Sequence, residues 1–288
     1  MKRIIFGWIL LLTCLVSGDD SRVSVVVNTE RAFAKMAVDK GIRAAFLQYL
    51  SKDSVTFRPG PVNAWQVYES RPESPALLVW GPDRALISQA EDMGFTTGPW
   101  SYSPKSGEKA VAWGQFATIW KKQPDGSWKV AFDAGTENPE PTSGAENPVF
   151  SDPSPKPASG LDLGSEKQKL RKIQSEFAQE VASGKAKEAY RDYSDDSNRL
   201  LREDQTPVSG KQAILASPSS YETAWKWQWV GGDLSQGADL AFEYGTGEFK
   251  NAKASYLRVW HKDSKDEWRI VLDLVLPHPP QTQTASTS

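Results

Sequence analysis

The chain has 288 residues, of which 39% are hydrophobic and 24% charged, and its formal net charge is −2. This length and balance suit one large or two ordinary globular domains and exclude an intrinsically disordered chain. A slightly acidic protein also lacks the basic face that nucleic-acid binding needs, so we expect no nucleic-acid partner. The 12 Trp residues are many for this length, and the fold must accommodate their large rings.

Residues 1–18 have the pattern of a cleaved export signal. Lys2 and Arg3 precede an apolar run from Ile4 to Val16, and the small residues Ser17 and Gly18 follow it. The run is shorter than the ~20 residues of a membrane-spanning helix, although an uncleaved anchor is the alternative. Cys14, the single cysteine, lies within this run, and lipid attachment there is a lesser alternative. We therefore expect a secreted or periplasmic protein without cysteine chemistry and without stable membrane insertion after signal cleavage.

Residues 19–137 are predicted to form a first domain. Phe33 and Ala37 recur at helical spacing, and Gly41 is typical of a helix end. A second short helix is expected around residues 45–49, and strand-like segments follow. The last two strands are joined by the polar loop of "WKKQPDGSWKV" (residues 120–130), which predicts a hairpin.

Residues 138–164 contain six prolines among Ser, Gly and Glu. Such a composition cannot bury a core and predicts a semi-extended linker, about 3 Å per residue where it is polyproline-like. Residues 165–276 are predicted to form a second domain, and residues 277–288 a polar, disordered tail.

The second domain repeats the first. A shift of 144 residues places Phe33 on Phe177 and Arg58 on Arg202, and "WHKDSKDEWRI" (residues 260–270) repeats the first hairpin. A shift of 140 residues then places Asp133 on Asp273, and the middle aligns less closely, with Trp80 near Trp229 and Gly98 near Gly247. This is a tandem duplication rather than a short-period solenoid. Each copy reads as two helices, a strand, a short helix and an antiparallel meander, which predicts an α+β fold with helices on one face of a curved sheet.

The helical opening "ERAFAKMAVDKGIRAAFLQYLSKD" and the closing "FATIWKKQPDGSWKVAFD", echoed by "YLRVWHKDSKDEWRIVLD", resemble the nuclear transport factor 2-like superfamily. The similarity is to its SnoaL-like and domain-of-unknown-function branch, related to ketosteroid isomerase, in two tandem copies. It implies cone-shaped domains that enclose a pocket and pair through their sheets, here within one chain. Many relatives carry a cavity-facing histidine just after the Asp of the last strand, where this chain has Ala134 and Leu274. The superfold hosts both enzymes and non-catalytic binders, so the site must decide the function.

Strand alternation predicts the faces of the candidate acids. Trp128, Val130, Phe132 and Ala134 share one parity, so Asp133, and likewise Asp273, are expected on the opposite, more exposed face in structural contacts. The same reasoning applies to Asp239 and Glu243. His261 is expected to be a solvated loop residue, and His278 lies in the tail. We therefore expect no catalytic residue, no metal site and no cofactor.

Aromatic residues are the stronger signal of function. Trp225, Trp227 and Trp229 alternate with polar residues and should project from one sheet face. Plain core packing explains such a face, but in a cone the core and the pocket wall are the same surface. The predicted pocket residues are Trp80, Trp113, Gln115, Trp225, Trp227, Trp229, Lys253 and Ser255.

The leading prediction is an exported, non-catalytic protein that binds an apolar or planar small molecule, or acts as an interaction module, through a Trp-lined pocket. One alternative is an isomerase, hydratase or hydrolase-like enzyme that uses a buried carboxylate and a Tyr. An acid with a raised pKa inside a cone would favour it. The other is a structural or adhesive envelope protein that binds a protein or glycan, which large exposed aromatic patches would favour.

Overall fold

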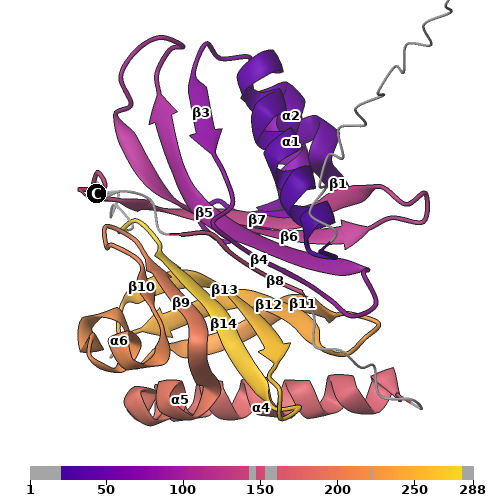
Figure 1. Cartoon of the computed structure of the whole chain (residues 1–288). Coiled ribbons are helices and arrows are strands. Elements are labelled where there is room, and N and C mark those ends of the chain that lie inside the picture. The colour runs from indigo at the N-terminus through magenta and orange to yellow at the C-terminus, as the bar shows by residue number, and fades with distance from the viewer. Residues whose placement is uncertain (1–20, 143–146, 153–160, 222, 281–288) are drawn as a thin grey trace, which may run out of the picture.

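The computed structural model describes residues 21–142, 147–152, 161–221 and 223–280, which form two α+β domains (Figure 1). The expected signal at residues 1–18, part of the expected linker and residues 281–288 of the expected tail lie outside these ranges. Each domain starts with two helices and ends in a curved antiparallel meander, as the sequence predicts. In the described segments, no helix is both long and apolar enough to cross a membrane.

The first domain begins with α1 (Ser24–Lys40) and α2 (Ile42–Tyr49). Its remaining elements are β1 (Leu50–Phe57), β2 (Pro61–Asn63), α3 (Ala64–Ser70), β3 (Leu77–Trp80), β4 (Arg84–Ile87), β5 (Met93–Ser103), β6 (Ala112–Lys122), β7 (Trp128–Asn138) and β8 (Val149–Ser151). The strands form one sheet in the order β2-β1-β7-β6-β5-β4-β8, and β3 also pairs with β5.

The second domain begins with α4 (Leu163–Ala182) and α5 (Ala186–Tyr193). It continues with β9 (Ser194–Arg202), β10 (Val208–Ser209), α6 (Lys211–Leu215), a 3₁₀ turn (Pro218–Ser220), β11 (Lys226–Leu234), β12 (Leu240–Phe249), β13 (Ala252–Lys262) and β14 (Trp268–Pro277). Its sheet order, β10-β9-β14-β13-β12-β11, matches the order β2-β1-β7-β6-β5 of the first domain at five of its strands. The duplication read from the sequence is therefore also a duplication of topology.

Local chemistry explains where the helices begin and end. Gly41 follows α1 with φ 89° and Gly184 follows α4 with φ 81°, a backbone region that favours glycine. The side chain of Asn63 accepts a hydrogen bond from the Gln66 backbone N–H at 2.8 Å and so caps α3. Asp162 caps α4 in the same way. These signals fix where the helices begin and end.

The Pro-rich segment contributes a short strand to the first domain. Val149–Ser151 forms β8, which pairs in parallel with β4. One residue later, the Asp152 carboxylate accepts a hydrogen bond from the Val23 backbone N–H at 2.7 Å, at the start of α1. Part of the segment expected to be only a linker is therefore bound to the first sheet.

A β-bulge near the end of each meander reverses the alternation of the last strand. In β6–β7, Ile119 pairs with Phe132 but Trp120 pairs with Val130, which leaves Ala131 extra. The same irregularity leaves Val271 extra between Leu272 and Ile270 in β14. Because one extra residue exchanges the two faces of a strand, residues before and after the bulge with the same parity point to opposite sides.

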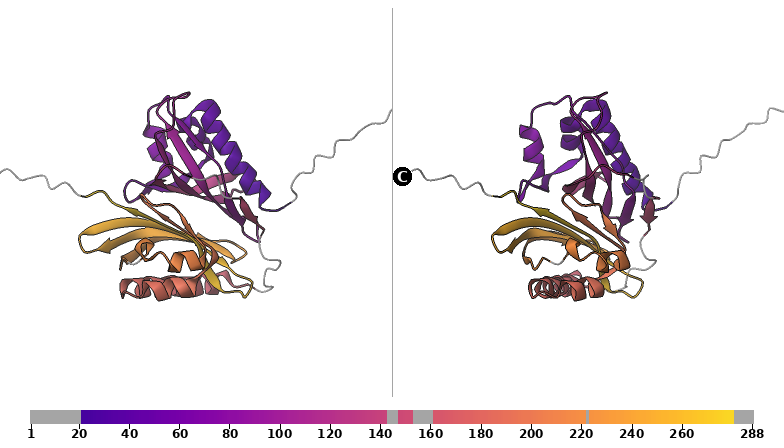
Figure 2. Two further views of the ribbon diagram at one scale, coloured as in Figure 1. Left: turned by 60° about the vertical axis from the view of Figure 1, so that its left-hand side comes forward. Right: turned by 90° about the vertical axis from the view of Figure 1, so that its left-hand side faces the viewer.

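The two sheets pack face to face, and the helices of each domain lie on the outer side (Figure 1 and Figure 2). The residues between the sheets form one apolar cluster, which includes Phe95, Ile119, Phe132 and Ala134 of the first domain and Phe242, Leu257, Leu272 and Leu274 of the second. A buried ion pair, Arg199 Nη1 to Asp83 Oδ1 at 2.8 Å, crosses the same interface. Phe132, Ala134, Leu272 and Leu274 thus face the other domain instead of sharing a face with Trp128 and Trp268.

Polar contacts at the edge of this interface are reciprocal. The Gln89 backbone N–H donates to the Asp239 carboxylate at 2.8 Å, and the Gln236 backbone N–H donates to the Asp92 carboxylate at 2.9 Å. The two turns are equivalent in the two copies, because Ser88 and Ser235 each bond the Asp four residues later. Such an exchange is the signature of a two-fold, isologous contact, here between two halves of one chain.

Candidate functional site

A cavity of about 500 Å³ lies inside the first domain, between its helices and the inner face of its sheet. Seven of the residues that line it are aromatic, namely Phe33, Phe46, Tyr68, Trp80, Trp100, Tyr102 and Phe116. The charged residues that line it are Arg58, Arg71, Asp133, Glu137 and Glu203. Because Glu203 and Leu276 belong to the second domain, the cavity borders both halves of the chain.

Packing between aromatic rings fixes much of the wall. Phe33 on α1 meets Phe46 and Trp80 edge to face, with ring centroids 4.8 Å and 4.9 Å apart. Phe46 in turn stacks on Tyr68 of α3 at 4.0 Å. Rings in such pairs have few alternative positions, so the wall is preformed.

Glu30 lies directly behind this wall and is fully buried. Its carboxylate accepts hydrogen bonds from Trp80 Nε1 at 2.6 Å, Thr96 Oγ1 at 2.6 Å and Trp120 Nε1 at 3.0 Å. Burial raises the pKa of Glu30, and these hydrogen bonds act against that rise. In the described residues Glu30 has no cationic partner, so its carboxyl is held only by hydrogen bonds beside the cavity.

Asp133 carries the main polar group inside the cavity. Its Oδ1 accepts a hydrogen bond from Thr118 Oγ1 at 3.0 Å. Burial and the nearby Glu30 raise the pKa of Asp133 to about 7, although Thr118 and Arg58 favour its ionised form. Asp133 therefore lies on the inner face of its strand, and the expectation of an exposed position is wrong. The bulge at Ala131 turns Asp133 inward.

Tyr68 supplies a neutral hydroxyl beside this carboxyl. Burial and the charge of Asp133 raise the pKa of Tyr68 above its ordinary value. The phenol is therefore protonated across the physiological range and can donate or accept a hydrogen bond.

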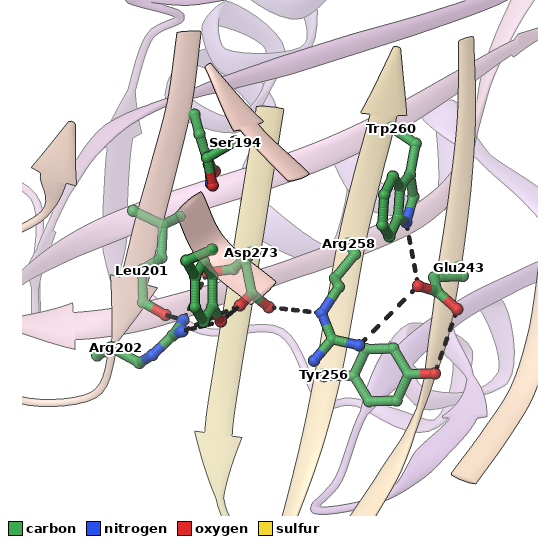
Figure 3. Close-up of polar contacts among 10 residues, drawn as sticks. Ser194, Leu201, Arg202, Glu243, Tyr256, Arg258, Trp260 and Asp273 are labelled. Carbon is green, nitrogen blue, oxygen red and sulfur yellow. Dashed lines mark hydrogen bonds and ion pairs between the residues drawn. The ribbon is translucent and has the colours of Figure 1, made fainter. Parts of the chain in front are cut away.

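The interior of the second domain is filled by an ion-pair network (Figure 3). Arg258, only 1% exposed, places Nε 3.1 Å from Asp273 Oδ1 and Nη1 3.9 Å from Glu243 Oε1. Asp273 also accepts hydrogen bonds from Arg202 at 3.0 Å and from the Tyr190 hydroxyl. Burial alone would raise the pKa of Asp273, but Arg258 and Arg202 hold it below its ordinary value.

Aromatic rings surround the same guanidinium. The Arg258 Cζ lies 4.2 Å from the ring centre of Tyr256 and 4.8 Å from those of Trp227 and Phe177. Trp260 Nε1 donates to Glu243 at 3.0 Å, as Trp120 does to Glu30. Beside Trp225 and Trp227 a cavity of about 130 Å³ remains. Asp273 and Glu243 are thus buried, in contrast to the expectation of exposed positions.

Of the predicted pocket residues, Trp80 lines the large cavity, and Trp225 and Trp227 line the small one. Trp229 is 46% exposed and lines neither, because it lies on the edge strand β11, where Arg171 of α4 covers its ring. Trp80 pairs with Trp100 of β5, and Trp227 pairs with Gly247 of β12. Trp100 and Gly247 occupy the same position along equivalent strands, so Trp227 is the equivalent of Trp80.

The other four predicted residues lie away from both cavities. Trp113 and Gln115 alternate with the cavity residue Phe116, so they point to the opposite face of β6. Ser255 is buried at the interface between the domains, where its hydroxyl donates to the Pro59 carbonyl at 2.8 Å. Lys253 is exposed and pairs loosely with Glu248.

The two histidines make ordinary contacts. His261 Nε2 lies 3.2 Å from Asp195 Oδ2, and His278 Nε2 lies 2.9 Å from the Ser255 hydroxyl. No three His, Cys, Asp or Glu side chains are grouped to hold a metal ion in the part of the chain that the structure describes.

Sequence reasoning missed Glu30, Thr118 and Arg258, although the sequence held a signal for two of them. Glu30 falls on the stripe of Val26, Phe33 and Ala37 at helical spacing, which is the buried face of α1. Arg258 alternates with Tyr256 and Trp260 on one face of β13, which places it inside. Neither signal tells whether such a buried charge has a partner.

No family model and no curated protein matches this chain. Among solved structures, similar chains are an NTF-2 like protein of unknown function from Silicibacter pomeroyi (10% identity, TM-score 0.34), nuclear transport factor 2 from Cryptosporidium parvum (15%, 0.33) and a protein of unknown function with a cystatin-like fold from Nostoc punctiforme (12%, 0.33). They cover 41%, 42% and 42% of this chain and 100%, 100% and 96% of their own. At such identities and TM-scores nothing about function passes to this chain, whose role must be argued from its site. The Silicibacter pomeroyi and Cryptosporidium parvum proteins belong by name to the nuclear transport factor 2-like proteins, the superfamily that the sequence resembles.

Proposed function

We propose that this protein binds a small molecule in the cavity of its first domain. The observation that carries the proposal is the contrast between the two interiors. The first holds about 500 Å³ of space behind a preformed aromatic wall, with the carboxyl of Asp133 facing inward. The second fills the equivalent space with its own Arg258. An aromatic cavity with a few polar groups is the usual form of a ligand site.

We further propose that the chain acts outside the cytoplasm, on the basis of residues 1–18 alone. Binding without catalysis is the leading form of the proposal. A binding protein needs only the cavity and its polar contacts, and Asp133 and Tyr68 can serve as those contacts.

An acid–base enzyme is the second candidate, and one observation favours it. Asp133, with a pKa of about 7, lies in the same cavity as the hydroxyl of Tyr68, whose own pKa is raised. A carboxyl with that pKa can take up and return a proton near neutrality, and a neutral phenol can stabilise a developing oxyanion. The adhesive alternative has less support. Among the described residues Trp229, 46% exposed, is the one Trp with an exposed side chain, and Arg171 covers its ring at 3.7 Å.

A fragment titration tests the proposal. Ligand-observed NMR would follow a set of one-ring and two-ring aromatic fragments, neutral and charged, in the presence of the full chain. Leu78→Trp fills the large cavity and should abolish the binding that the native chain shows. Thr223→Trp, at the small cavity of the second domain, is the matched control and should leave binding unchanged.

The opposite result, in which no fragment binds or binding persists in Leu78→Trp, would overturn the proposal. Native mass spectrometry of the purified chain separates the two candidates. A bound molecule that is released unchanged after incubation supports binding, and one that is released chemically altered supports the enzyme.

A further inference from the structure

The two interiors can be compared position by position, because the strand registers match. Thr118 pairs with Asp133 in β6–β7, and Arg258 pairs with Asp273 in β13–β14, in each case just before the bulge. On the neighbouring strand, Thr96 pairs with Thr118 where Glu243 pairs with Arg258. Thr118 therefore stands in the first domain where Arg258 stands in the second.

Nearly every group that surrounds the Arg258 guanidinium has a counterpart in the first domain. The rings of Phe177, Trp227 and Tyr256 correspond to those of Phe33, Trp80 and Phe116, all of which line the cavity. Asp273 corresponds to Asp133. Glu243, which accepts from Trp260, has its counterpart in Glu30, which accepts from Trp120 but comes from α1 instead of from a strand.

What the first domain lacks is the cation. Asp133 and Glu30 form no ion pair with any described residue, whereas Asp273 and Glu243 both pair with Arg258. A carboxylate without an ion-pair partner among aromatic rings is costly, and a ligand cation over the ring faces would remove that cost.

Other charged groups near Asp133 bear on this argument. Arg58, after β1, and Arg71, after α3, line the cavity, but both residues are exposed to solvent, which weakens their effect on a ligand inside. Glu137 of β7 and Glu203 of the second domain line it as well and add negative charge. Among the lining groups and Glu30, carboxyls thus outnumber cations.

We propose that the ligand of the first cavity carries a planar cation, a guanidinium or amidinium group, which takes the place that the Arg258 guanidinium occupies in the second domain and binds Asp133. This inference rests on the proposed function and names the chemical class of its ligand. The second domain shows, within the same chain, the complex that the first domain is built to form with a separate molecule.

Three probes of one shape test the charge. Isothermal titration of the full chain with benzamidine, benzamide and benzoate compares a cation, a neutral isostere and an anion. Benzamidine should bind at least about tenfold more tightly than benzamide, since its amidinium pairs with a carboxylate, and benzoate should bind least. Benzamidine should also bind more tightly as the pH rises through about 7, where Asp133 ionises.

Two substitutions of one residue locate the binding. Thr118→Arg should place a guanidinium in the cavity, as in the second domain, and abolish benzamidine binding. Thr118→Val removes the hydrogen bond to Asp133 but leaves the space, so it should keep benzamidine binding within a few-fold and control for folding defects.

Each other outcome contradicts the inference. If benzamide binds as tightly as benzamidine, the cavity binds small molecules but not as a cation site, and the proposed function survives without this inference. If benzamidine still binds to a folded Thr118→Arg chain, the cation lies elsewhere. If none of the three probes binds at all, and the fragment titration is also negative, the proposed function fails together with the inference.

Discussion

The interiors of the two domains have the same strand order and the same bulge but opposite contents. The second is closed by Arg258 between two carboxylates and three rings, and the first keeps the rings and the carboxylates around an open cavity. One position, Thr118 or Arg258, accounts for most of the difference. The comparison teaches that a duplicated cone becomes either a packed ionic core or a binding site according to whether the chain itself supplies the cation.

The two domains also differ in which element supplies the carboxylate that accepts from a buried indole N–H. The carboxylate beneath the indole of Trp120 comes from Glu30 on α1, and the one beneath Trp260 comes from Glu243 on β12. At the helix position the second domain has the buried Gln174, and at the strand position the first has Thr96. The acceptor for the indole N–H is thus kept while the element that provides it changes, because an unpaired buried indole N–H would cost stability.

The largest effect is expected from removing the internal cation. Arg258→Met keeps the volume but leaves Asp273 and Glu243 buried without their shared partner. We expect unfolding free energy to fall by roughly 3–5 kcal/mol, as for other broken buried ion pairs. Equilibrium urea unfolding measures it. Lys172→Met, which loses an exposed ion pair with Glu176, is the control and should cost under about 1 kcal/mol. A loss for Arg258→Met as small as that of the control would contradict the network.

The next largest effect is the opposite pH dependence of stability that Asp133 and Asp273 should cause. The folded-state pKa of Asp133, about 7, is above its ordinary value. Between these two pH values the folded state binds more protons than the unfolded state, so the free energy of unfolding falls as the pH rises toward 7. Asp133→Asn should therefore raise the unfolding free energy by roughly 2 kcal/mol at about pH 8 and by little near about pH 4. For Asp273 the folded pKa is lowered, so its stabilisation is lost as the pH falls below the ordinary value.

Thermal unfolding across this pH range measures the difference. Asp125→Asn is the control, because Asp125 is an exposed turn residue whose pKa is lowered by its hydrogen bonds from Ser127. It should show no gain in stability at alkaline pH. An Asp133→Asn chain that is equally stabilised at all pH values would mean that Asp133 does not titrate near 7.

The smallest effect concerns the reciprocal contacts between the domains. Asp92→Ala and Asp239→Ala each remove the acceptor of one backbone N–H of the other domain. We expect each to lower the unfolding free energy by about 1 kcal/mol, and the two losses to be similar because the contacts are equivalent. Urea midpoints measure them, with Asp53→Ala on the exposed face of β1 as control. Strongly unequal losses would show that the two halves do not share this interface symmetrically.

The sequence was sufficient for the architecture and insufficient for the site. Repeated hairpins and helical spacing predicted two α+β domains, because those signals depend on local periodicity. The cavity residues depended on a feature that leaves little trace in a sequence: the extra residue at Ala131 and Val271 moves Asp133 and Asp273 to the inner face. Trp229 was misplaced for a different reason: alternation predicts its side of β11, but not that β11 is an edge strand on which the ring stays 46% exposed. The predictions for Asp133 and Asp273 failed because they relied on unbroken alternation through a bulge.

The contact between the halves has a genetic consequence. In a homodimer every substitution is made twice, so a change that suits one subunit is imposed on its partner. Here Gln89 and Gln236 anchor two surfaces that are equivalent in space but separately encoded. An arginine could therefore enter one interior without entering the other, and one half of the chain was free to become a rigid support, contributing Glu203 and Leu276 to the wall, while the other kept its space open.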